Sequence, residues 1–260
     1  MKDMDSLLAQ VLAFRPNRLV PPFDLQGHIP FVAWLVKELQ PATFVQLGTQ
    51  SGNLYFAACQ TVAENSLPTR CWAVGTWQAE ELAQHHSVQQ EPGASDYNRQ
   101  HFGAFSGLLR MGDAQALPRF APGSIDLLLI DGRYSPETVR NEYESWRDRL
   151  SDHAVVLLVG IEQADSGAAV LWQQLKAQYP HLAFAHAQGL GVLAVGRNVP
   201  KAFQQALQAC ATPEARNQLA GVADMLLGAQ VQAGMQAQIE ALTARLAERD
   251  EQCSQLQRTQ

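Results

Sequence analysis

The ten residues from Phe44 to Asn53 constrain the fold of this chain more than any other segment. A short apolar run ends in Gly48, a second glycine follows at Gly52, and a helical pattern begins at once and continues through residues 54–62. A strand that turns into a helix through glycines lets backbone N–H groups approach a nucleotide-like ligand closely. We therefore expect an α/β domain with a ligand-binding edge at this corner.

From this corner onward, short apolar runs alternate with helical segments. This alternation is typical of a parallel sheet covered by helices on both faces. The last two runs are separated only by residues 187–190, which permits a hairpin and predicts an antiparallel last strand. The predicted strands are 43–47, 71–74, 107–110, 125–130, 154–159, 182–186 and 191–195, and the predicted helices are 53–64, 78–87, 113–119, 136–149 and 168–178.

The chain divides by composition into three parts. Residues 1–42 form a lead-in with helical patterns at 6–14 and 29–39, residues 43–198 form the α/β domain, and residues 199–260 form a helical extension. Within the domain, the polar segment 88–105 interrupts the alternation and is interpreted as a mobile loop, or a lid, over the site.

The extension is rich in Ala, Gln and Leu and is expected to be helical from residue 201 to 228, after which apolar residues recur at spacings of four and three. That repeat is an a/d heptad pattern of about three heptads, and it predicts the start of a coiled coil to a second copy or a partner protein. A helix packed on its own domain is the alternative interpretation. The pattern runs almost to the last residue, so the chain is interpreted as a fragment of a longer protein. The positions are Met235, Ile239, Leu242, Leu246, Cys253 and Leu256, with Arg249 in the one place that the pattern skips.

Composition excludes several classes of protein. The 260 residues are 47% hydrophobic, which suffices for one sizeable core, and the net charge of −6 provides no basic surface for nucleic acid. The four cysteines form no close pair and are expected to stay reduced, and no segment reads as a signal peptide or membrane span. The sequence thus predicts a cytoplasmic protein, with association at the inner membrane face through a partner left open.

The order of elements, ending in the antiparallel hairpin, resembles the class I S-adenosylmethionine (SAM)-dependent methyltransferases, which share a Rossmann-like, doubly wound seven-stranded sheet. About two-thirds of the chain, residues 27–196, looks more specifically like a bacterial methyltransferase domain found in multi-domain proteins of surface-polysaccharide and glycan synthesis. Each short match is weak alone, and their order makes the resemblance specific. The matching stretches are Gly27-His28-Ile29-Pro30-Phe31, Val45-Gln46-Leu47-Gly48-Thr49, Ala73-Val74-Gly75-Thr76-Trp77, Gly123-Ser124-Ile125-Asp126-Leu127, Ile130-Asp131-Gly132, Glu144-Ser145-Trp146, Leu171-Trp172 and Gly189-Leu190-Gly191-Val192-Leu193.

The resemblance implies which residues meet the cofactor. The strand–helix corner at residues 44–53 supplies four cofactor-binding candidates: Gln46, Gly48, Thr49 and Gly52. Further cofactor-binding candidates are Gly75 and Trp77 after the second strand, with Trp77 stacking on adenine. Asp113 follows the third strand, and the resemblance places such an acid near the adenine amino group. Its alternative role is to N-cap the helical residues 114–119, and the two roles can coexist.

Asp131 is the candidate catalytic residue, because it ends the fourth strand, where open α/β sheets place their ligands. It would act as a base on an acceptor hydroxyl. The resemblance places a His-Asp pair after the fifth strand, where this chain has Val159 and Gly160. One carboxylate does not make a divalent-metal site, so no metal is expected.

Several other polar positions depart from the resembled pattern. Gln46 stands where the family usually carries Glu, Leu129 stands where it often has His, and Gly75 stands where an acid grips both ribose hydroxyls of SAM. Loss of the two charge-assisted contacts at positions 46 and 75 would weaken cofactor binding roughly a hundredfold or more.

Two functional hypotheses follow from this pattern. The first is an active O-methyltransferase that acts on a sugar or another hydroxyl. The second is a degenerate methyltransferase domain that serves as a binding or scaffold module, and the clustered losses with an intact apolar scaffold favour it. A nicotinamide-binding Rossmann domain is a weaker alternative, because a third glycine at the usual spacing after Gly52 is absent.

Overall fold

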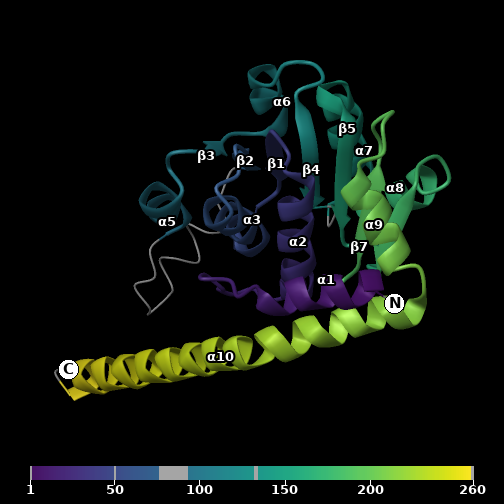
Figure 1. Cartoon of the computed structure of the whole chain (residues 1–260). Helices are drawn as coiled ribbons and strands as arrows, with labels where there is room; N and C mark the ends of the chain where they lie inside the picture. Colours follow the sequence, from purple (N-terminus) through teal and green to yellow (C-terminus); the bar gives the residue numbers. More distant parts are fainter. Residues whose placement is uncertain (1, 50, 76–92, 132–133, 259–260) are drawn as a thin grey trace.

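The computed structural model describes residues 2–49, 51–75, 93–131 and 134–258, and its centre is a seven-stranded sheet (Figure 1). The strand order is β3-β2-β1-β4-β5-β7-β6; β7 runs antiparallel to both β5 and β6, and the other neighbouring strands are parallel. The predicted fold class and the antiparallel last strand are therefore confirmed. The strands are β1 (Thr43–Leu47), β2 (Arg70–Gly75), β3 (Ser106–Arg110), β4 (Ile125–Asp131), β5 (Leu150–Val159), β6 (His181–Phe184) and β7 (Leu190–Ala194).

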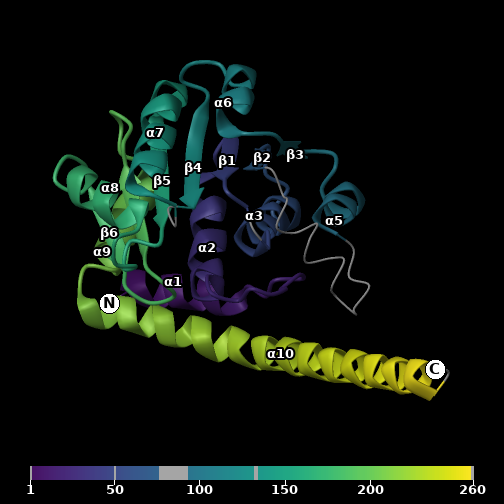
Figure 2. The ribbon, with the colours of Figure 1, turned by 180° about the vertical axis from the view of Figure 1, so that it is seen from behind.

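Helices cover both faces of this sheet, as the two opposite views show (Figures 1 and 2). Most of the predicted helices are present within a few residues of their expected bounds, whereas 78–87 lies outside the described residues. The α-helices are α1 (Lys2–Ala13), α2 (Ile29–Leu39), α3 (Asn53–Glu64), α5 (Ala94–His101), α6 (Asp113–Ala116), α7 (Pro136–Trp146), α8 (Gly167–Leu175), α9 (Lys201–Ala209) and α10 (Pro213–Arg258), and the 3-10 helices are η1 (Gln26–His28), η2 (Leu117–Arg119) and η3 (Arg147–Arg149).

The sheet separates two apolar cores, because successive side chains of a strand point to opposite faces. On β4, Leu127 and Leu129 pack with α2, α3 and α9, whereas Leu128 and Ile130 pack with α7 and α8. All four side chains are buried, which explains why the central strand reads as a continuous apolar run. Trp34, Trp146 and Trp172 are buried in these cores.

Two stretches differ from the sequence interpretation. Part of the segment interpreted as a loop or lid forms the helix α5, whose Asn98 donates to Ser106 O at 3.1 Å and so fixes the helix against the edge strand β3. The helical region expected over 201–228 is two helices, because α9 ends at Ala209 and Pro213 begins α10. Thr212 Oγ1 accepts from Ala215 N at 3.2 Å at that start.

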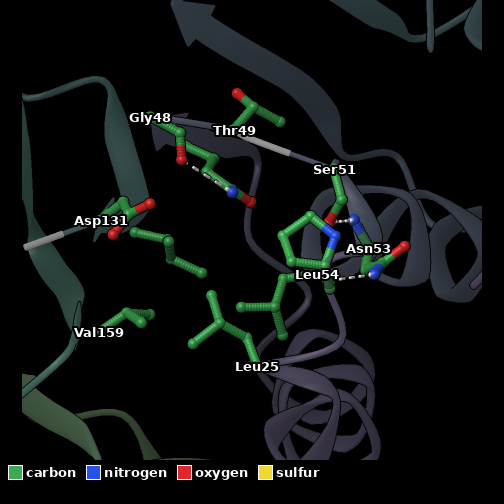
Figure 3. Close-up of a pocket in the computed structure, with 11 residues that line it drawn as sticks. Leu25, Gly48, Thr49, Ser51, Asn53, Leu54, Asp131 and Val159 are labelled. Atoms are coloured by element: carbon green, nitrogen blue, oxygen red, sulfur yellow. Dashed lines mark hydrogen bonds between the residues drawn. The ribbon is translucent and has the colours of Figure 1, made fainter. Parts of the chain in front are cut away.

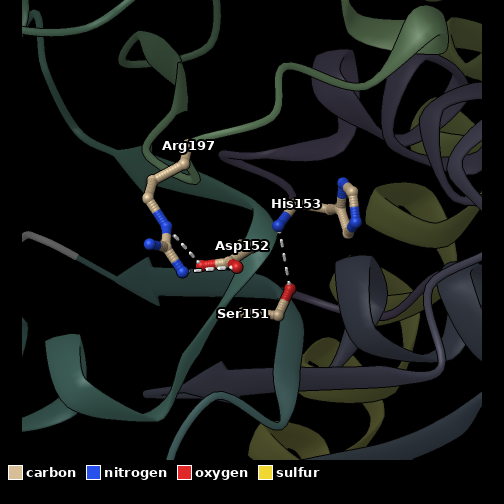
Figure 4. A network of polar contacts seen from close by, with 4 residues as sticks. All are labelled: Ser151, Asp152, His153 and Arg197. Carbon is tan, nitrogen blue, oxygen red and sulfur yellow. Dashed lines mark hydrogen bonds and ion pairs between the residues drawn. The ribbon is translucent and has the colours of Figure 1, made fainter.

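A bidentate ion pair ties the start of β5 to the segment after β7 (Figure 4). Arg197 Nε and Nη2 donate to the two carboxylate oxygens of Asp152 at 2.9 and 2.6 Å. These hydrogen bonds lower the pKa of Asp152. Both side chains are exposed, so the pair adds little to the stability of the fold.

A histidine clasp joins the N-terminal part of the chain to the β6–β7 turn. His28 Nε2 lies 3.0 Å from Ala187 O, His186 Nε2 lies 3.0 Å from Gly27 O, and the two ring centroids are 4.5 Å apart. His28 is completely buried, as befits a structural residue. Within the described part of the chain, no helix is long and apolar enough to cross a membrane.

Candidate functional site

The β1–α3 corner depends on two glycines in left-handed backbone. Gly48 has φ +73° and Gly52 has φ +76°, a conformation that glycine adopts without steric cost. Gly48 N donates to Val74 O at 3.0 Å, and Gly52 N donates to Thr49 O at 2.8 Å. The strand therefore turns into α3 within five residues, as the glycine spacing predicts.

A small pocket opens at the carboxyl ends of β1, β4 and β5, beside this corner (Figure 3). Its cavity of about 10 Å³ has room for a single water molecule. Segments far apart in sequence meet there, because parallel strands end at the same edge of the sheet. The lining residues are Pro22, Leu25, Gln46, Gly48, Thr49, Ser51, Asn53, Leu54, Leu129, Asp131 and Val159.

Buried acceptors line the β1 side of the pocket. Gln46 is 3% exposed, and its Nε2 donates to Gly48 O at 3.3 Å while its Oε1 has no hydrogen-bond partner among the described residues. Thr49 Oγ1 is likewise buried and unpartnered there. Asp131, 2% exposed, faces them from the end of β4. Because unpaired buried acceptors are costly, this arrangement suits a ligand that brings hydrogen-bond donors or positive charge.

Gly48 also sets the spacing between β1 and Asp131. A Cβ added at Gly48 would lie 3.0 Å from Asp131 Cβ and 3.6 Å from Tyr134 Cε2. The backbone at position 48 can approach the Asp131 carboxylate closely only because glycine has no side chain, and the positive φ also favours glycine there.

We expect the Gly48→Ala variant to lose about 1–2 kcal/mol of unfolding free energy, because alanine is strained in left-handed backbone and would crowd Asp131. Urea denaturation measures the loss. The matched control is Gly112→Ala, where φ is −68° and no atom lies within 4 Å of the added Cβ. That control should stay within about 0.5 kcal/mol of the wild type. Equal losses in the two variants would contradict a special role for Gly48.

The remaining cofactor-binding candidates lie at the next two strand ends. Gly75 is the last residue of β2 and pairs in register with Arg110 of β3. No side chain extends from this position toward a ligand, whereas the resemblance calls for a carboxylate there. Trp77 lies outside the described residues. Asp113 is the first residue of α6, and Gly112 occupies the N-cap position without a side-chain cap bond. The N-cap interpretation of Asp113 is therefore wrong.

Asp113 instead shares a hydrogen bond with Glu142 of α7, which the sequence interpretation missed. Burial, the hydrogen bond to Asp113 and the charges of Asp113 and Asp131 raise the pKa of Glu142 to about 8. Burial raises the pKa of Asp113 as well. These pKa shifts indicate that the carboxyl groups of Asp113 and Glu142 share one proton. Glu142 therefore holds a proton at neutral pH beside the acid that the resemblance assigns to adenine.

The Glu142→Gln variant tests this shared proton. The folded-state pKa is above the unfolded value, so the stability contributed by protonated Glu142 is present below pH 4.5 and is lost as pH rises through about 8. Glutamine keeps the hydrogen bond and does not titrate. We expect the variant to gain roughly 1 kcal/mol over wild type between pH 6 and 9, after allowance for solvent screening. Urea denaturation of the variant and the wild type at pH 6 and at pH 9 measures the gain in unfolding free energy. Glu144→Gln, on the exposed face of α7, should show no such gain, and an equal gain there would contradict the pairing.

Among the described residues, the pocket fits the methionine end of SAM. Gln46 Oε1 and Thr49 Oγ1 are buried acceptors without a partner in this part of the chain, and Asp131 adds a carboxylate, so these groups suit an ammonium group. Position 75 offers no side chain to the ribose hydroxyls.

Comparisons with known sequences found one family match and one curated relative. Residues 45–158 match the family described as "Methyltransferase domain". The uncharacterized protein y4gI of Sinorhizobium fredii is 36% identical over 197 residues, and the chain spans only 22% of that relative's length while 75% of the chain is aligned.

Solved methyltransferase structures are also similar to the chain. The S-adenosylhomocysteine (SAH)-bound methyltransferase PaMTH1 of Podospora anserina has a TM-score of 0.49 at 11% identity, over 74% of this chain and 87% of that one. The O-methyltransferase TomG of Streptomyces achromogenes, in complex with SAM, has a TM-score of 0.48 at 12% identity, over 75% and 90%. The matched residues 45–158 include the glycine corner and Asp131, so this part of the chain is similar to the methyltransferase family.

Proposed function

We propose that this chain carries a SAM-dependent methyltransferase domain that has kept the methionine end of its cofactor site and lost the ribose anchor. Its affinity for SAM is weak, and its main role is that of a binding or scaffold module. The family match over residues 45–158 supports SAM as the ligand class. The degenerate character rests on particular positions, chiefly Gly75 and Gln46.

One observation carries this proposal. At one strand end, Gln46 Oε1 is buried without a hydrogen-bond partner in the described structure, while at the next strand end Gly75 contributes no side chain at all. The first position favours a donor-bearing ligand. The second removes the carboxylate that would hold a ribose diol, a contact of about 1.5–3 kcal/mol. A half-retained site of this kind supports weak binding rather than none.

Binding of SAH to a Gln46→Leu variant tests the retained half. Leucine has a similar volume and no acceptor, so we expect the dissociation constant in titration calorimetry to rise about tenfold relative to wild type. Gln205→Leu, on the exposed face of α9, is the matched control and should bind as wild type does. Equal affinity in the Gln46 variant and the wild type would contradict the proposed contact at position 46.

An active O-methyltransferase is the alternative function. Its support is the buried carboxylate of Asp131 at the pocket, which is placed to accept the proton of an acceptor hydroxyl as the methyl group is transferred in line. Formation of SAH in the presence of a sugar panel, in wild type and not in Asp131→Asn, would establish this alternative. Turnover that persists in Asp131→Asn would remove Asp131 from the mechanism.

The biological setting is proposed from the sequence resemblance. We place the domain in a multi-domain protein of surface-glycan assembly, in the cytoplasm, where a partner can hold it at the inner membrane face. A glycan is then the acceptor or ligand. The division into 1–42, 43–198 and 199–260 and the self-association of α10 belong to the same proposal.

A further inference from the structure

The long helix α10 carries two different apolar faces. Its first half packs against α1, α2 and η1, where Leu219, Ala223 and Leu227 are buried. Its second half continues past α1 in both views of the molecule (Figures 1 and 2). Apolar side chains in that half are largely exposed: Met235 at 50%, Ile239 at 58%, Leu242 at 49% and Leu246 at 64%.

These exposed residues lie on one stripe with a period of 3.5 residues. We call the set Met235, Ile239, Leu242, Leu246, Arg249, Cys253 and Leu256 the heptad seam. Ile239, Leu246 and Cys253 take a positions, and the other members take d positions. The same register extended toward the N-terminus places Met225, 67% exposed, at a further a position. A spacing that is kept over three heptads is typical of a two-helix interface.

The seam faces away from the rest of the molecule. At about 100° per residue, Met235, Ile239, Leu242 and Leu246 are centred roughly 130° around the helix from the body-packing residues Leu219, Ala223 and Leu227. Two further contacts lie on the body side. Gln230 Nε2 donates to Pro16 O at 3.4 Å, and a Cβ at Gly234 would lie 3.0 Å from Phe23 Cζ. A second helix can therefore reach the seam without displacing α1 or η1.

We propose that the heptad seam binds the same seam of a second copy of this chain, in a parallel, in-register, two-stranded coiled coil. A β-branched residue at a with leucine at the following d, as in Ile239 and Leu242, favours two parallel strands. Packing of the first half of α10 on the body orders the helix in advance and so lowers the entropic cost of pairing.

Charge complementarity selects the parallel arrangement. Arg245 takes a g position, and Asp250 takes the e position five residues later. In a parallel in-register pair, g of one helix faces that e of the other, so the sequence register sets position 245 of one chain opposite position 250 of the other. Antiparallel pairing instead brings g against g, and the g positions 238, 245 and 252 carry no acidic residue.

Sedimentation equilibrium of the full chain tests the dimer. We expect the mass of two chains near 100 µM, with dissociation on dilution. The Ile239→Asp/Leu246→Asp variant places four carboxylates in the seam and should weaken association at least a hundredfold. Ala244→Asp/Ala247→Asp adds the same charge off the seam and should associate as wild type does. A single chain at 100 µM in wild type, or an unchanged dimer in the seam variant, would overturn the proposal.

Cysteine cross-linking tests the orientation. In the parallel register, Cys253 at an a position faces Cys253 of the other chain, so copper–phenanthroline should oxidise the two thiols to one disulfide between the chains. The other three cysteines are buried and stay unlinked. Cys253→Ser is the control and should give no linked dimer. A dimer that forms no such link under oxidation would overturn the parallel arrangement.

Discussion

Replacement of Gly75 by aspartate is expected to tighten SAM binding by about ten- to a hundredfold. A carboxylate at the end of β2 would accept hydrogen bonds from both ribose hydroxyls, and such charge-assisted contacts contribute about 1.5–3 kcal/mol. Gly75 lies within a strand and, unlike Gly48 and Gly52, has no positive φ, so aspartate fits its backbone. Titration calorimetry with SAM measures the gain.

The isosteric Gly75→Asn variant is the control for this experiment, because it adds the same volume without the charge. It should recover a small part of the gain at most. Adding Gln46→Glu to Gly75→Asp restores both carboxylates and should tighten binding further. If SAM affinity is still undetectable in that double variant, the assignment of positions 46 and 75 is wrong.

The second large effect concerns the stability of the fold against acid. Burial, with a smaller contribution from the neighbouring His186, lowers the pKa of His28 from 6.5 to about 3. His28 therefore binds a proton below about pH 6.5 in the unfolded chain but only below about pH 3 in the folded chain. The contribution of neutral His28 is therefore fully present above pH 6.5 and is lost as pH falls toward 3, at up to about 1.4 kcal/mol per pH unit.

Between pH 7.5 and 5.5 this group should remove about 1.4 kcal/mol from the unfolding free energy of the wild type. The His28→Gln variant keeps a donor near Ala187 O and does not titrate, so its urea midpoint should be less sensitive to pH by that amount. His181→Gln, on the exposed start of β6, should retain the wild-type sensitivity. The same pH sensitivity in His28→Gln and wild type would refute this account of the clasp.

The parts of the fold that the sequence predicts well are those with strong local signals. The run of residues 127–130 is apolar without a break, and such a run predicts a central strand whose side chains are buried on both faces of the sheet. All four side chains are buried in the structure. The two glycines of the β1–α3 corner adopt positive φ angles, and their spacing in the sequence already indicates a turn there. The short link between the last two strands permits only an antiparallel pair.

The parts that escaped prediction depend on tertiary contacts. Helix α5 is polar overall, so it lacks the apolar periodicity from which a helix can be predicted. Hydrogen bonds between Asn98 and Ser106 hold it against β3. Glu142 looks like an ordinary exposed helix residue until the fold brings it to Asp113. The unpartnered Oε1 of Gln46 likewise becomes meaningful only once burial is known.

The assignments of Gln46, Gly48, Thr49, Gly52, Gly75 and Asp113 to cofactor contacts, and of Asp131 to catalysis, stay predictions. The structure places Gln46, Gly48, Thr49 and Asp131 on one pocket, with Gly52 at the adjoining corner. Gly75 and Asp113 lie at the ends of the two strands farther out. This is the edge where parallel sheets hold ligands.

Titration calorimetry of the wild-type chain with SAM tests the central claim most directly. The claim is that the site keeps a methionine-end pocket but lacks the ribose anchor because position 75 is glycine. We predict a dissociation constant weaker than about 100 µM, which corresponds to less than about 5.5 kcal/mol of binding free energy. A dissociation constant of about 10 µM or tighter would contradict the claim, because the site would then hold its cofactor without the carboxylate.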